Sequence, residues 1–313
     1  MVRTAVLFPG QGSQCVGMAK ELFERHAAAR SLLSGVDAAL GRGLLELMFQ
    51  GPEEVLKDTA NTQPALYAAG LAVFACLRAE GVTADAYAGH SLGEYCALQA
   101  AGVFSFLDGL KLVQARATAM AKAAAGSEGG MAAILKMDDS AVEEACRKAS
   151  TAGPVCPANY NAPGQLVISG SKAGLEAAMH LCKTAGGRSI ALSVSGPFHS
   201  PAMAPAGDEL KRAFGGLAWS PPSALVLANV DAAPLATVEE VQAKLVEQIS
   251  APVRWTQTIQ ALKERGFRRY IEAGPGKVLA GLVKKIDPEA LVYSVGDPAS
   301  LEAAVSELKN QEG

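Results

Sequence analysis

The residue with the clearest chemical context is Ser91, which lies in the sequence Gly-His-Ser-Leu-Gly-Glu at 89–94. This sequence fits the pattern G-x-S-x-G; an apolar stretch at 85–89 precedes it, and small residues from about 92 to 101 follow. The pattern predicts a sharp strand-to-helix turn that exposes the serine hydroxyl, with glycines on both sides to relieve crowding. The first N–H groups of the helix would favour an oxyanion that develops beside them. We therefore interpret Ser91 as a nucleophile, although Ser91 and Glu94 also fit a capping box in which the serine only caps the helix.

A serine hydroxyl is a weak nucleophile and needs a base, so the four histidines are the candidates. His90 adjoins the serine on the turn and would point away from it. Two others fall on predicted helices, namely His26 and His180. His199 lies in the proline-containing segment 195–201, directly after a predicted strand, where α/β sheets place functional groups. We expect His199 to be the base, with a structural loop histidine as the alternative, and we expect acylation to fall near neutral pH as an ordinary imidazole protonates.

The sequence does not select an acid that would complete a Ser-His-Asp triad. Four carboxyl residues follow His199 without a distinguishing context, namely Asp208, Glu209, Asp231 and Glu247. A backbone carbonyl that orients the imidazole is the other arrangement that chemistry allows.

Arg116 is a cation in the middle of an apolar helical face. At 100° per residue its neighbours on that face are apolar or small, namely Gly109, Leu112, Val113, Met120 and Ala123. A buried guanidinium is costly unless it is paired. Arg116 therefore either meets a carboxylate of the protein or receives an anionic ligand, and its planar fork suits a carboxylate bound through two parallel hydrogen bonds.

A glycine-rich loop, Pro-Gly-Gln-Gly-Ser-Gln at 9–14, follows the first predicted strand. Glycine-rich loops in this place often bind phosphate, but this one lacks the Gly-Lys-Ser/Thr of a Walker A loop and has Cys15 where G-x-G-x-x-G needs its last glycine. Its amides and Gln11 are placed to donate hydrogen bonds to an oxyanion at a neighbouring strand end. A simple tight turn is the alternative.

The elements that must position these residues alternate between short apolar runs and longer helical ones, which predicts an α/β fold with a largely parallel sheet. Strands are expected at 4–8, 85–89, 224–230, 268–273 and 290–295. Helices are expected at 16–48, 63–80, 92–101, 107–124 and from about 299.

A glycine-rich linker at 126–130 interrupts this pattern. After it the expected order is strand, helix, strand, strand, helix, strand, at 131–136, 139–150, 154–160, 165–169, 171–185 and 188–194. This βαββαβ order is the signature of a ferredoxin-like unit. We therefore predict that residues 127–196 form a subdomain inserted into a larger domain made of 1–126 and 197–313.

The composition is that of a compact globular enzyme: 313 residues, 50% of them hydrophobic, with a formal net charge of -3. A chain so close to neutral has no overall attraction for nucleic acid or for an anionic membrane, so neither is expected as a partner. No apolar run has the length of a membrane span, and the six cysteines form no CxxC pair, so reduced thiols and a cytoplasmic location are expected. The histidine and cysteine spacings do not predict a metal site.

Seven segments, in this order along nearly the whole chain, resemble the motifs of the malonyl-CoA:acyl-carrier-protein transacylases and the acyltransferase domains of fatty-acid and polyketide synthases. These segments are FPGQGSQ (8–14), GHSLGE (89–94), QARATAM (114–120), NYNAPGQLVISG (159–170), SGPFHS (195–200), QISAPVRW (248–255) and EAGPGKVL (272–279). The resemblance implies a hydrolase-like α/β domain with an inserted ferredoxin-like subdomain.

The resemblance also implies roles for the residues that match those motifs. Ser91 would carry the acyl group as an ester, and His199 would be the general base and acid. The main-chain carbonyl of Gln248 would orient His199, so that no triad acid is needed. Gln11 and the backbone N–H of Leu92 would form the oxyanion hole.

Three further positions would form the acyl pocket by the same resemblance. Arg116 would pair with the malonyl carboxylate, and Met120 and Phe198 would line the pocket. A phenylalanine directly before the histidine accompanies malonyl in the acyltransferase domains that the chain resembles, and here its ring would fill the space of an α-methyl group.

The implied reaction moves a malonyl group from malonyl-CoA to the phosphopantetheine thiol of acyl carrier protein by a ping-pong route through a malonyl ester on Ser91. The partners would be malonyl-CoA and acyl carrier protein, and no cofactor is expected beyond the phosphopantetheine that the partner carries. The alternative is a serine esterase or thioesterase that uses the same Ser-His pair with water as the acceptor. A buried Arg116 argues against that alternative, because a neutral ester gives its charge nothing to bind.

Overall fold

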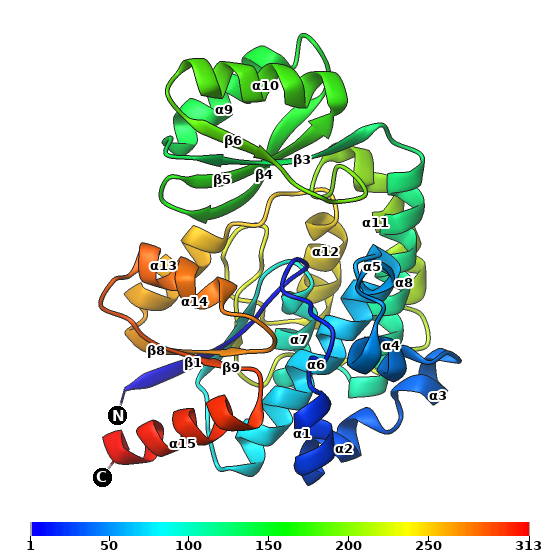
Figure 1. Cartoon of the computed structure of the whole chain (residues 1–313), viewed down its shortest axis with the longest axis vertical. Coiled ribbons are helices and arrows are strands. Elements are labelled where there is room, and N and C mark those ends of the chain that lie inside the picture. Colours follow the sequence, from blue (N-terminus) through cyan, green and yellow to red (C-terminus); the bar gives the residue numbers. More distant parts are fainter. Residues whose placement is uncertain (1, 313) are drawn as a thin grey trace.

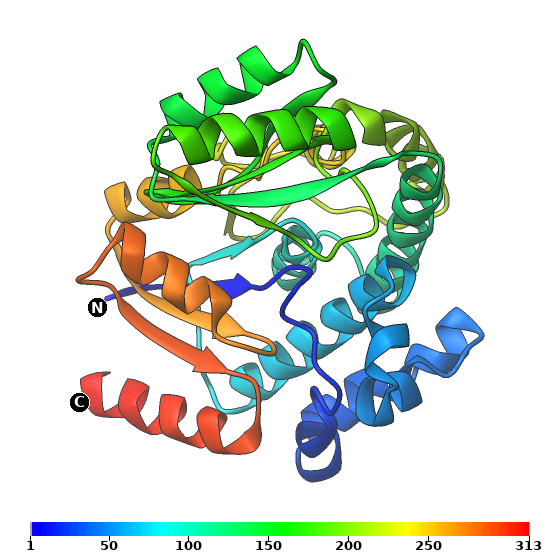
Figure 2. The same ribbon diagram turned by 45° about the horizontal axis from the view of Figure 1, so that its top comes forward.

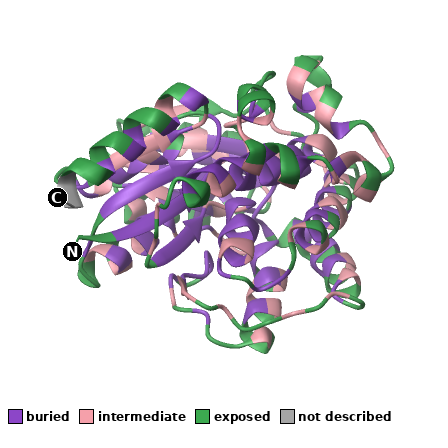
Figure 3. Ribbon diagram, turned by 90° about the horizontal axis from the view of Figure 1, so that it is seen from below, coloured by how far each residue is buried: buried purple, intermediate pink, exposed green. Residues whose placement is uncertain are grey.

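The computed structural model describes residues 2–312 and contains two separate sheets, one above the other in Figure 1. The larger sheet has five parallel strands in the order β7-β2-β1-β8-β9. Their bounds are β1 (Arg3–Phe8), β2 (Ala86–Gly89), β7 (Leu225–Val226), β8 (Phe267–Ala273) and β9 (Leu291–Val295). Most residues of β1, β2 and β8 are buried, as expected for a parallel sheet covered on both faces, whereas the edge strand β9 is partly exposed (Figure 3).

The helices that cover this sheet come from both ends of the chain (Figure 1). Before the second sheet they are α1 (Lys20–Arg25), α2 (Ala27–Leu33), α3 (Val36–Leu40), α4 (Leu44–Gln50), α5 (Glu53–Leu56), α6 (Thr59–Ala79), α7 (Gly93–Ala100) and α8 (Phe106–Ala125). After it they are the 3₁₀ turn η1 (Pro201–Met203), α11 (Ala204–Ala213), α12 (Val238–Gln248), α13 (Trp255–Glu264), α14 (Val278–Ile286) and α15 (Pro298–Glu312). Within residues 2–312, none of these helices combines the length and the apolar composition that a membrane span requires.

The smaller sheet has four antiparallel strands in the order β4-β5-β3-β6, and two helices cover one of its faces (Figure 2). Along the chain its elements are β3 (Gly129–Leu135), α9 (Asp139–Ala149), β4 (Val155–Ala162), β5 (Gln165–Ser171), α10 (Lys172–Thr184) and β6 (Arg188–Ala191). They enclose a core of their own between sheet and helices. The predicted α/β fold with a βαββαβ unit in its middle is therefore confirmed.

Main-chain hydrogen bonds join the smaller sheet to the larger unit. Tyr160 N–H donates to the Val253 carbonyl at 2.9 Å, and Val253 N–H donates to the Ala158 carbonyl at 2.8 Å. The Thr256 hydroxyl adds a bond to the Tyr160 carbonyl at 3.1 Å. The segment before α13 thus lies beside β4 like one more short strand, and the smaller unit cannot move freely over the larger one.

Two of the expected elements differ from the structure. The helical stretch predicted at 16–48 is divided into four short helices, because glycines such as Gly41, at φ 65°, end one helix and turn the chain into the next. The strand predicted at 224–230 pairs only over β7, because the chain after it folds back in a tight turn, with Leu227 bridged to Pro234.

Candidate active site

Ser91 lies on the turn between β2 and α7, as the G-x-S-x-G pattern predicts, and its φ is 52°, in the left-handed region. The two flanking glycines allow this geometry. A Cβ on Gly89 would lie 1.9 Å from the Gly93 carbonyl carbon, and a Cβ on Gly93 would lie 2.0 Å from the Phe8 carbonyl oxygen. Only glycine therefore lets α7 approach β1 and β2 this closely, and the resulting strained turn directs the hydroxyl out of the fold.

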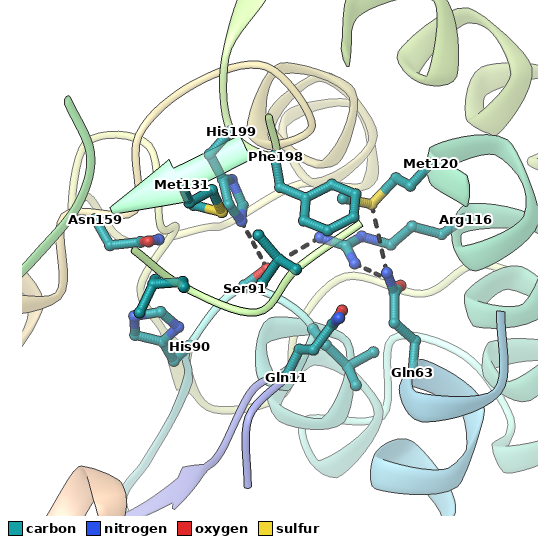
Figure 4. Close-up of a pocket in the computed structure, with 13 residues that line it drawn as sticks. Gln11, Gln63, His90, Ser91, Arg116, Met120, Met131, Asn159, Phe198 and His199 are labelled. Atoms are coloured by element: carbon teal, nitrogen blue, oxygen red, sulfur yellow. Dashed lines mark hydrogen bonds between the residues drawn. The ribbon is translucent and has the colours of Figure 1, made fainter. Parts of the chain in front are cut away.

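The Ser91 hydroxyl faces His199, which is 108 residues away in the sequence (Figure 4). Ser91 Oγ and His199 Nε2 are 2.8 Å apart. On the other side of the ring, Nδ1 lies 3.0 Å from the main-chain oxygen of Gln248 and 3.1 Å from that of Ala251. Because carbonyl oxygens only accept hydrogen bonds, Nδ1 carries the hydrogen and Nε2 is left with the lone pair that faces the serine.

His199 has no carboxylate partner among residues 2–312, so the acid that the sequence did not select is replaced by two backbone carbonyls. The ring is 4% exposed, and its backbone has a φ of 56°. Burial, with the nearby charge of Arg116, lowers the pKa of His199 to about 3. The imidazole is therefore neutral at pH 7 and ready to accept a proton.

The capping-box alternative for Ser91 does not match the observed contacts. The helix α7 begins after Leu92, without a side-chain cap, and the Ser91 hydroxyl bonds His199 and Arg116 instead. Glu94 is fully buried and bonds the Gln248 side chain.

Arg116, on α8, points into the site and is 1% exposed (Figure 4). Its Nη1 donates to Gln63 Oε1 at 2.5 Å, and its Nη2 donates to Gln248 Oε1 at 2.9 Å and to Ser91 Oγ at 3.2 Å. No carboxylate oxygen of the described chain lies within ion-pair distance of it. Burial lowers the pKa of the guanidinium. Arg116 thus meets neutral amide oxygens and a hydroxyl rather than the protein carboxylate of the structural alternative.

These groups line one cavity of about 110 Å³, between the two sheets. Its walls include every residue to which the family resemblance assigned a role except Gln248, which bonds Arg116 and His199 from outside the cavity. The lining residues are Gln11, Gln63, His90, Ser91, Leu92, Arg116, Met120, Met131, Asn159, Leu192, Val194, Phe198 and His199. The larger unit thus supplies the polar groups, and β3, β4 and the segment after β6 close the cavity with mostly apolar side chains.

Gln11 reaches the cavity from the loop after β1, where its Nε2 donates to Thr59 Oγ1 at 3.2 Å. Leu92 precedes the first turn of α7, so its N–H is among those that no intrahelical carbonyl receives. His90 points away from Ser91, and its Nε2 lies 2.8 Å from Asn161 Oδ1. Phe198 and Met120 are 5% and 2% exposed, and both face the cavity (Figure 4).

Three buried polar residues at the site were missed by the sequence analysis. Gln63 on α6 holds Arg116, and Asn229 holds the turn through Ser91 N–H and the Gly89 carbonyl, each at 2.7 Å. Asn159, on β4, lines the cavity. Asn229, a polar residue between apolar ones, was an available signal, and Asn159 begins one of the seven motifs. Gln63 follows other polar residues, so its neighbours did not mark it. Among the described residues, no cluster of three or more histidine, cysteine or acidic side chains is arranged to hold a metal ion.

Comparison with known proteins agrees with this geometry. The acyl transferase domain family matches residues 6–295. The malonyl CoA-acyl carrier protein transacylase of Bacillus subtilis is 43% identical over 313 residues, covering 99% of both chains, and that of Escherichia coli is 39% identical, covering 97% of this chain and 99% of its own. The crystal structure of the acyl-carrier-protein S-malonyltransferase from Burkholderia pseudomallei is 44% identical and superposes with a TM-score of 0.93, covering 97% and 99%.

A second solved structure contains a partner. It is a type II PKS acyl-carrier protein in complex with its malonyl-transacylase, at 38% identity and a TM-score of 0.94, covering 97% of this chain and 99% of that one. The relatives match along their whole length, with the two-unit fold and at a level of identity that places them in one family. The chain therefore belongs to the acyl transferase family, among the malonyl CoA-acyl carrier protein transacylases.

Proposed function

We propose that this acyltransferase moves a malonyl group from malonyl-CoA to the phosphopantetheine thiol of acyl carrier protein, through an ester on Ser91. The observation that carries the proposal is a single hydroxyl with two partners: Ser91 Oγ lies 2.8 Å from a neutral His199 nitrogen and 3.2 Å from the buried Arg116 guanidinium. A nucleophile beside its base is what acyl transfer requires, and a cation without a protein carboxylate suits an acyl group that carries one.

In the first half-reaction, Ser91 Oγ attacks the thioester carbonyl of malonyl-CoA while His199 Nε2 takes its proton. The tetrahedral intermediate expels the CoA thiolate, which receives the proton from His199, and the malonyl ester remains on Ser91. In the second half-reaction the phosphopantetheine thiol gives its proton to His199 and attacks the ester carbonyl. Ser91 leaves and takes the proton back, so the enzyme is regenerated after a ping-pong cycle that needs no metal or prosthetic group.

The oxyanion of both tetrahedral intermediates would be stabilised by Gln11 and by the N–H of Leu92. Leu92 N–H belongs to the N-terminal end of α7, where the helix dipole favours negative charge. The Gln11 side-chain amide has two hydrogens, and Thr59 accepts one of them, which leaves the other for the substrate. The two carbonyls beyond His199, those of Gln248 and Ala251, would hold the imidazolium that forms between the two proton transfers.

Arg116 favours transfer of a dicarboxylic acyl group over the hydrolysis of neutral esters. In the absence of substrate its donors are received by amide oxygens and a hydroxyl. A malonyl carboxylate in the cavity would give the guanidinium a full counter-charge, whereas a neutral acyl group would leave the buried cation with neutral acceptors alone. Phe198 and Met120, which line the same cavity, would limit the size of the acyl group.

Intact mass spectrometry after incubation with malonyl-CoA tests the covalent step. We expect a malonyl adduct that peptide mapping places on the peptide containing Ser91, and no adduct in Ser91→Ala. Ser195→Ala is the matched control, because Ser195 is an exposed serine of the same region whose hydroxyl bonds Thr59 Oγ1. An adduct on another residue, or one that survives in Ser91→Ala, would show that the mechanism is wrong.

A further inference from the structure

The side-chain amide of Gln248 lies between Arg116 and the carboxyl group of Glu94. Gln248 Oε1 accepts from Arg116 Nη2 at 2.9 Å. Gln248 Nε2 donates to Glu94 Oε2 at 2.5 Å and to the Ser91 carbonyl at 3.0 Å. Both amide hydrogens are thus used on one side, and the amide oxygen faces the guanidinium on the other.

This orientation of the amide is fixed by what surrounds it. If the amide turned over, its oxygen would face the Glu94 carboxyl and the Ser91 carbonyl, and its NH₂ group would face a guanidinium that only donates. Glu94 itself is held in place, because its Oε2 also accepts from Asn229 N–H at 3.2 Å, and Asn229 is bonded to the turn that carries Ser91.

Glu94 does not line the cavity and so does not touch the acyl group. It is 0% exposed, on α7, and the charged and titratable groups around it are Arg116 from α8, Asp231 from the segment after β7, and Tyr95 from its own helix. Burial raises the pKa of Glu94 to about 7, against the opposite effect of its hydrogen bonds and of Arg116. Burying a carboxyl group is costly, and the hydrogen bond to Gln248 gives Glu94 a function that would offset this cost.

Arg116 needs such a support to grip a carboxylate. Two parallel hydrogen bonds to a carboxylate require a guanidinium plane that does not rotate. Gln63 fixes Nη1, and the Gln248 oxygen fixes Nη2. Loss of the second contact would leave Nη2 with the longer bond of 3.2 Å to Ser91 Oγ, and the guanidinium plane would be held less firmly.

We propose that Glu94 is a positioning residue: it orients the Gln248 amide, which holds Arg116 toward the acyl cavity, and it thereby sets the preference for a carboxylate-bearing acyl group over a neutral one. The inference rests on the proposed function, in which Arg116 binds the malonyl carboxylate. Glu94 would act on selectivity through two other side chains.

Two substitutions separate the reach of the Glu94 side chain from its charge. Glu94→Gln keeps an oxygen at the same reach and removes the charge, whereas Glu94→Asp keeps the charge and withdraws the oxygen by one methylene. The measurement is the ratio of kcat/KM for malonyl-CoA to that for acetyl-CoA, with Tm recorded for each protein. We expect Glu94→Asp to lower the ratio by about tenfold or more, the order for a lost hydrogen bond to a charged group. Glu94→Gln should keep it within about threefold.

Glu272→Asp is the matched control, because Glu272 is also a fully buried glutamate, which caps α14 through the N–H groups of Leu279 and Ala280 and does not line the cavity. It should lower Tm without moving the ratio. A ratio lowered in Glu94→Gln but kept in Glu94→Asp would assign the effect to charge and overturn the positioning role. Should Glu94→Asp not fold, Gln248→Leu removes the amide and keeps the main-chain carbonyl at His199; an unchanged ratio in that variant also overturns the inference.

Arg116→Ala distinguishes this inference from the function on which it rests. If Arg116→Ala leaves the malonyl-to-acetyl ratio unchanged, the carboxylate-binding role of Arg116 is wrong, and the inference falls with it. If Arg116→Ala lowers the ratio while Glu94→Asp does not, the function stands and only the positioning role of Glu94 is wrong.

Discussion

His199 combines a basic nitrogen with a setting that keeps it unprotonated. Its backbone is in the left-handed region, its ring is buried, and its Nδ1 is held by two carbonyls. Burial of the ring, followed by the nearby charge of Arg116, lowers its pKa to about 3. The sequence predicts that the His199 imidazole becomes protonated, and the base is lost, near neutral pH. The structure places this protonation much further into the acid range.

We predict that the His199 imidazole does not titrate between pH 8 and pH 5. The measurement is the ring Cε1–H shift in an NMR pH titration, with the signal assigned by its absence in His199→Gln. An inflection of that signal near pH 6.5 would contradict the prediction. Any pH dependence of acylation near pH 7 should then come from another group, and Glu94, with its pKa of about 7, is the candidate that Glu94→Gln tests.

The same pKa shift has a consequence for stability. Below pH 6.5 His199 is protonated in the unfolded chain, whereas in the folded chain it becomes protonated only near pH 3. The free energy of unfolding therefore falls with decreasing pH in this window, by up to about 1.4 kcal/mol per pH unit for one such group. Glu94 has the opposite effect on the free energy of unfolding between pH 7 and 4.5, because its pKa is raised in the folded chain. Glu94 is present in both proteins compared, so its effect cancels. The Tm of His199→Gln should therefore fall less than that of the parent chain between pH 6.5 and pH 5.

At the residue level, the sequence predicts side chains whose local pattern is informative. Ser91 is flanked by glycines that indicate a sharp turn, and His199 is flanked by prolines that indicate a rigid loop. Arg116 lies on an apolar helical face, which indicates a buried cation. Gln63, Asn229 and the contact of Glu94 with Gln248 were not predictable, because each depends on residues more than 50 positions apart. An isolated polar residue in an apolar stretch shows that a partner exists without showing which one.

The element that decides the site is the strand-turn-helix unit of β2 and α7. Its sequence predicts the geometry, since Gly89 and Gly93 lie where α7 approaches the strands most closely. Elements with less local information were predicted less well: β7 is two residues long because tertiary pairing, rather than the apolar run at 224–230, decides where the strand ends. Helix and strand types were therefore predictable along most of the chain, and their ends were not.

We predict that Gly93→Ala lowers both Tm and the rate of acylation at Ser91. The new methyl group would lie 2.0 Å from the Phe8 carbonyl oxygen, so α7 must move away from β1 and carry the nucleophile with it. A backbone shift of this kind costs about 1–3 kcal/mol or more, and a displaced nucleophile should react at least about tenfold more slowly. The measurements are thermal unfolding and the rate of ester formation with malonyl-CoA.

Gly281→Ala is the control for this substitution. Gly281 lies within α14, is exposed, and has no atom within 4 Å of the position that a Cβ would take. Alanine should stabilise the helix there by about 0.5–1 kcal/mol, with no change in acylation. Gly93→Ala with a Tm and a rate equal to those of the parent would mean that the close approach of α7 to β1 is not needed.

At the scale of the whole molecule, the cavity exists only because the two units are joined. The larger unit carries Ser91, His199 and Arg116, and the smaller unit closes the cavity with side chains such as Met131 and Asn159. The order of elements in the sequence predicts both units, since the smaller one is a run of consecutive elements that interrupts the larger one. It does not predict how they face each other, because that depends on the pairing of Val253 with β4 across about a hundred residues.

We propose the domain division that the sequence suggests, with residues 127–196 as one unit and with 1–126 and 197–313 as the other. The two segments that connect the units, 125–128 and 191–195, are largely exposed. The two ends of the smaller unit lie close together, since a Cβ on Gly129 would lie 2.9 Å from the Pro197 side chain. An inserted unit requires such neighbouring ends.

We predict that limited digestion with a protease of broad specificity, such as subtilisin, first cuts the chain within 125–128 or 191–195, because exposed connecting segments are cleaved before helices and strands. The resulting fragments should elute together in size-exclusion chromatography, since β3 remains paired with β5 and β6, and Val253 remains paired with β4. N-terminal sequencing and intact mass of the first products give the cut sites. First cuts inside 129–190, or fragments that separate without denaturant, would show that the unit boundaries or the bonds between the units are not those proposed here.

The location of both proposed catalytic residues in the larger unit makes the same experiment a test of the site, because Ser91 precedes both segments and His199 follows them. If the two units fold around the contacts described, the nicked protein keeps these residues in one core despite the broken chain.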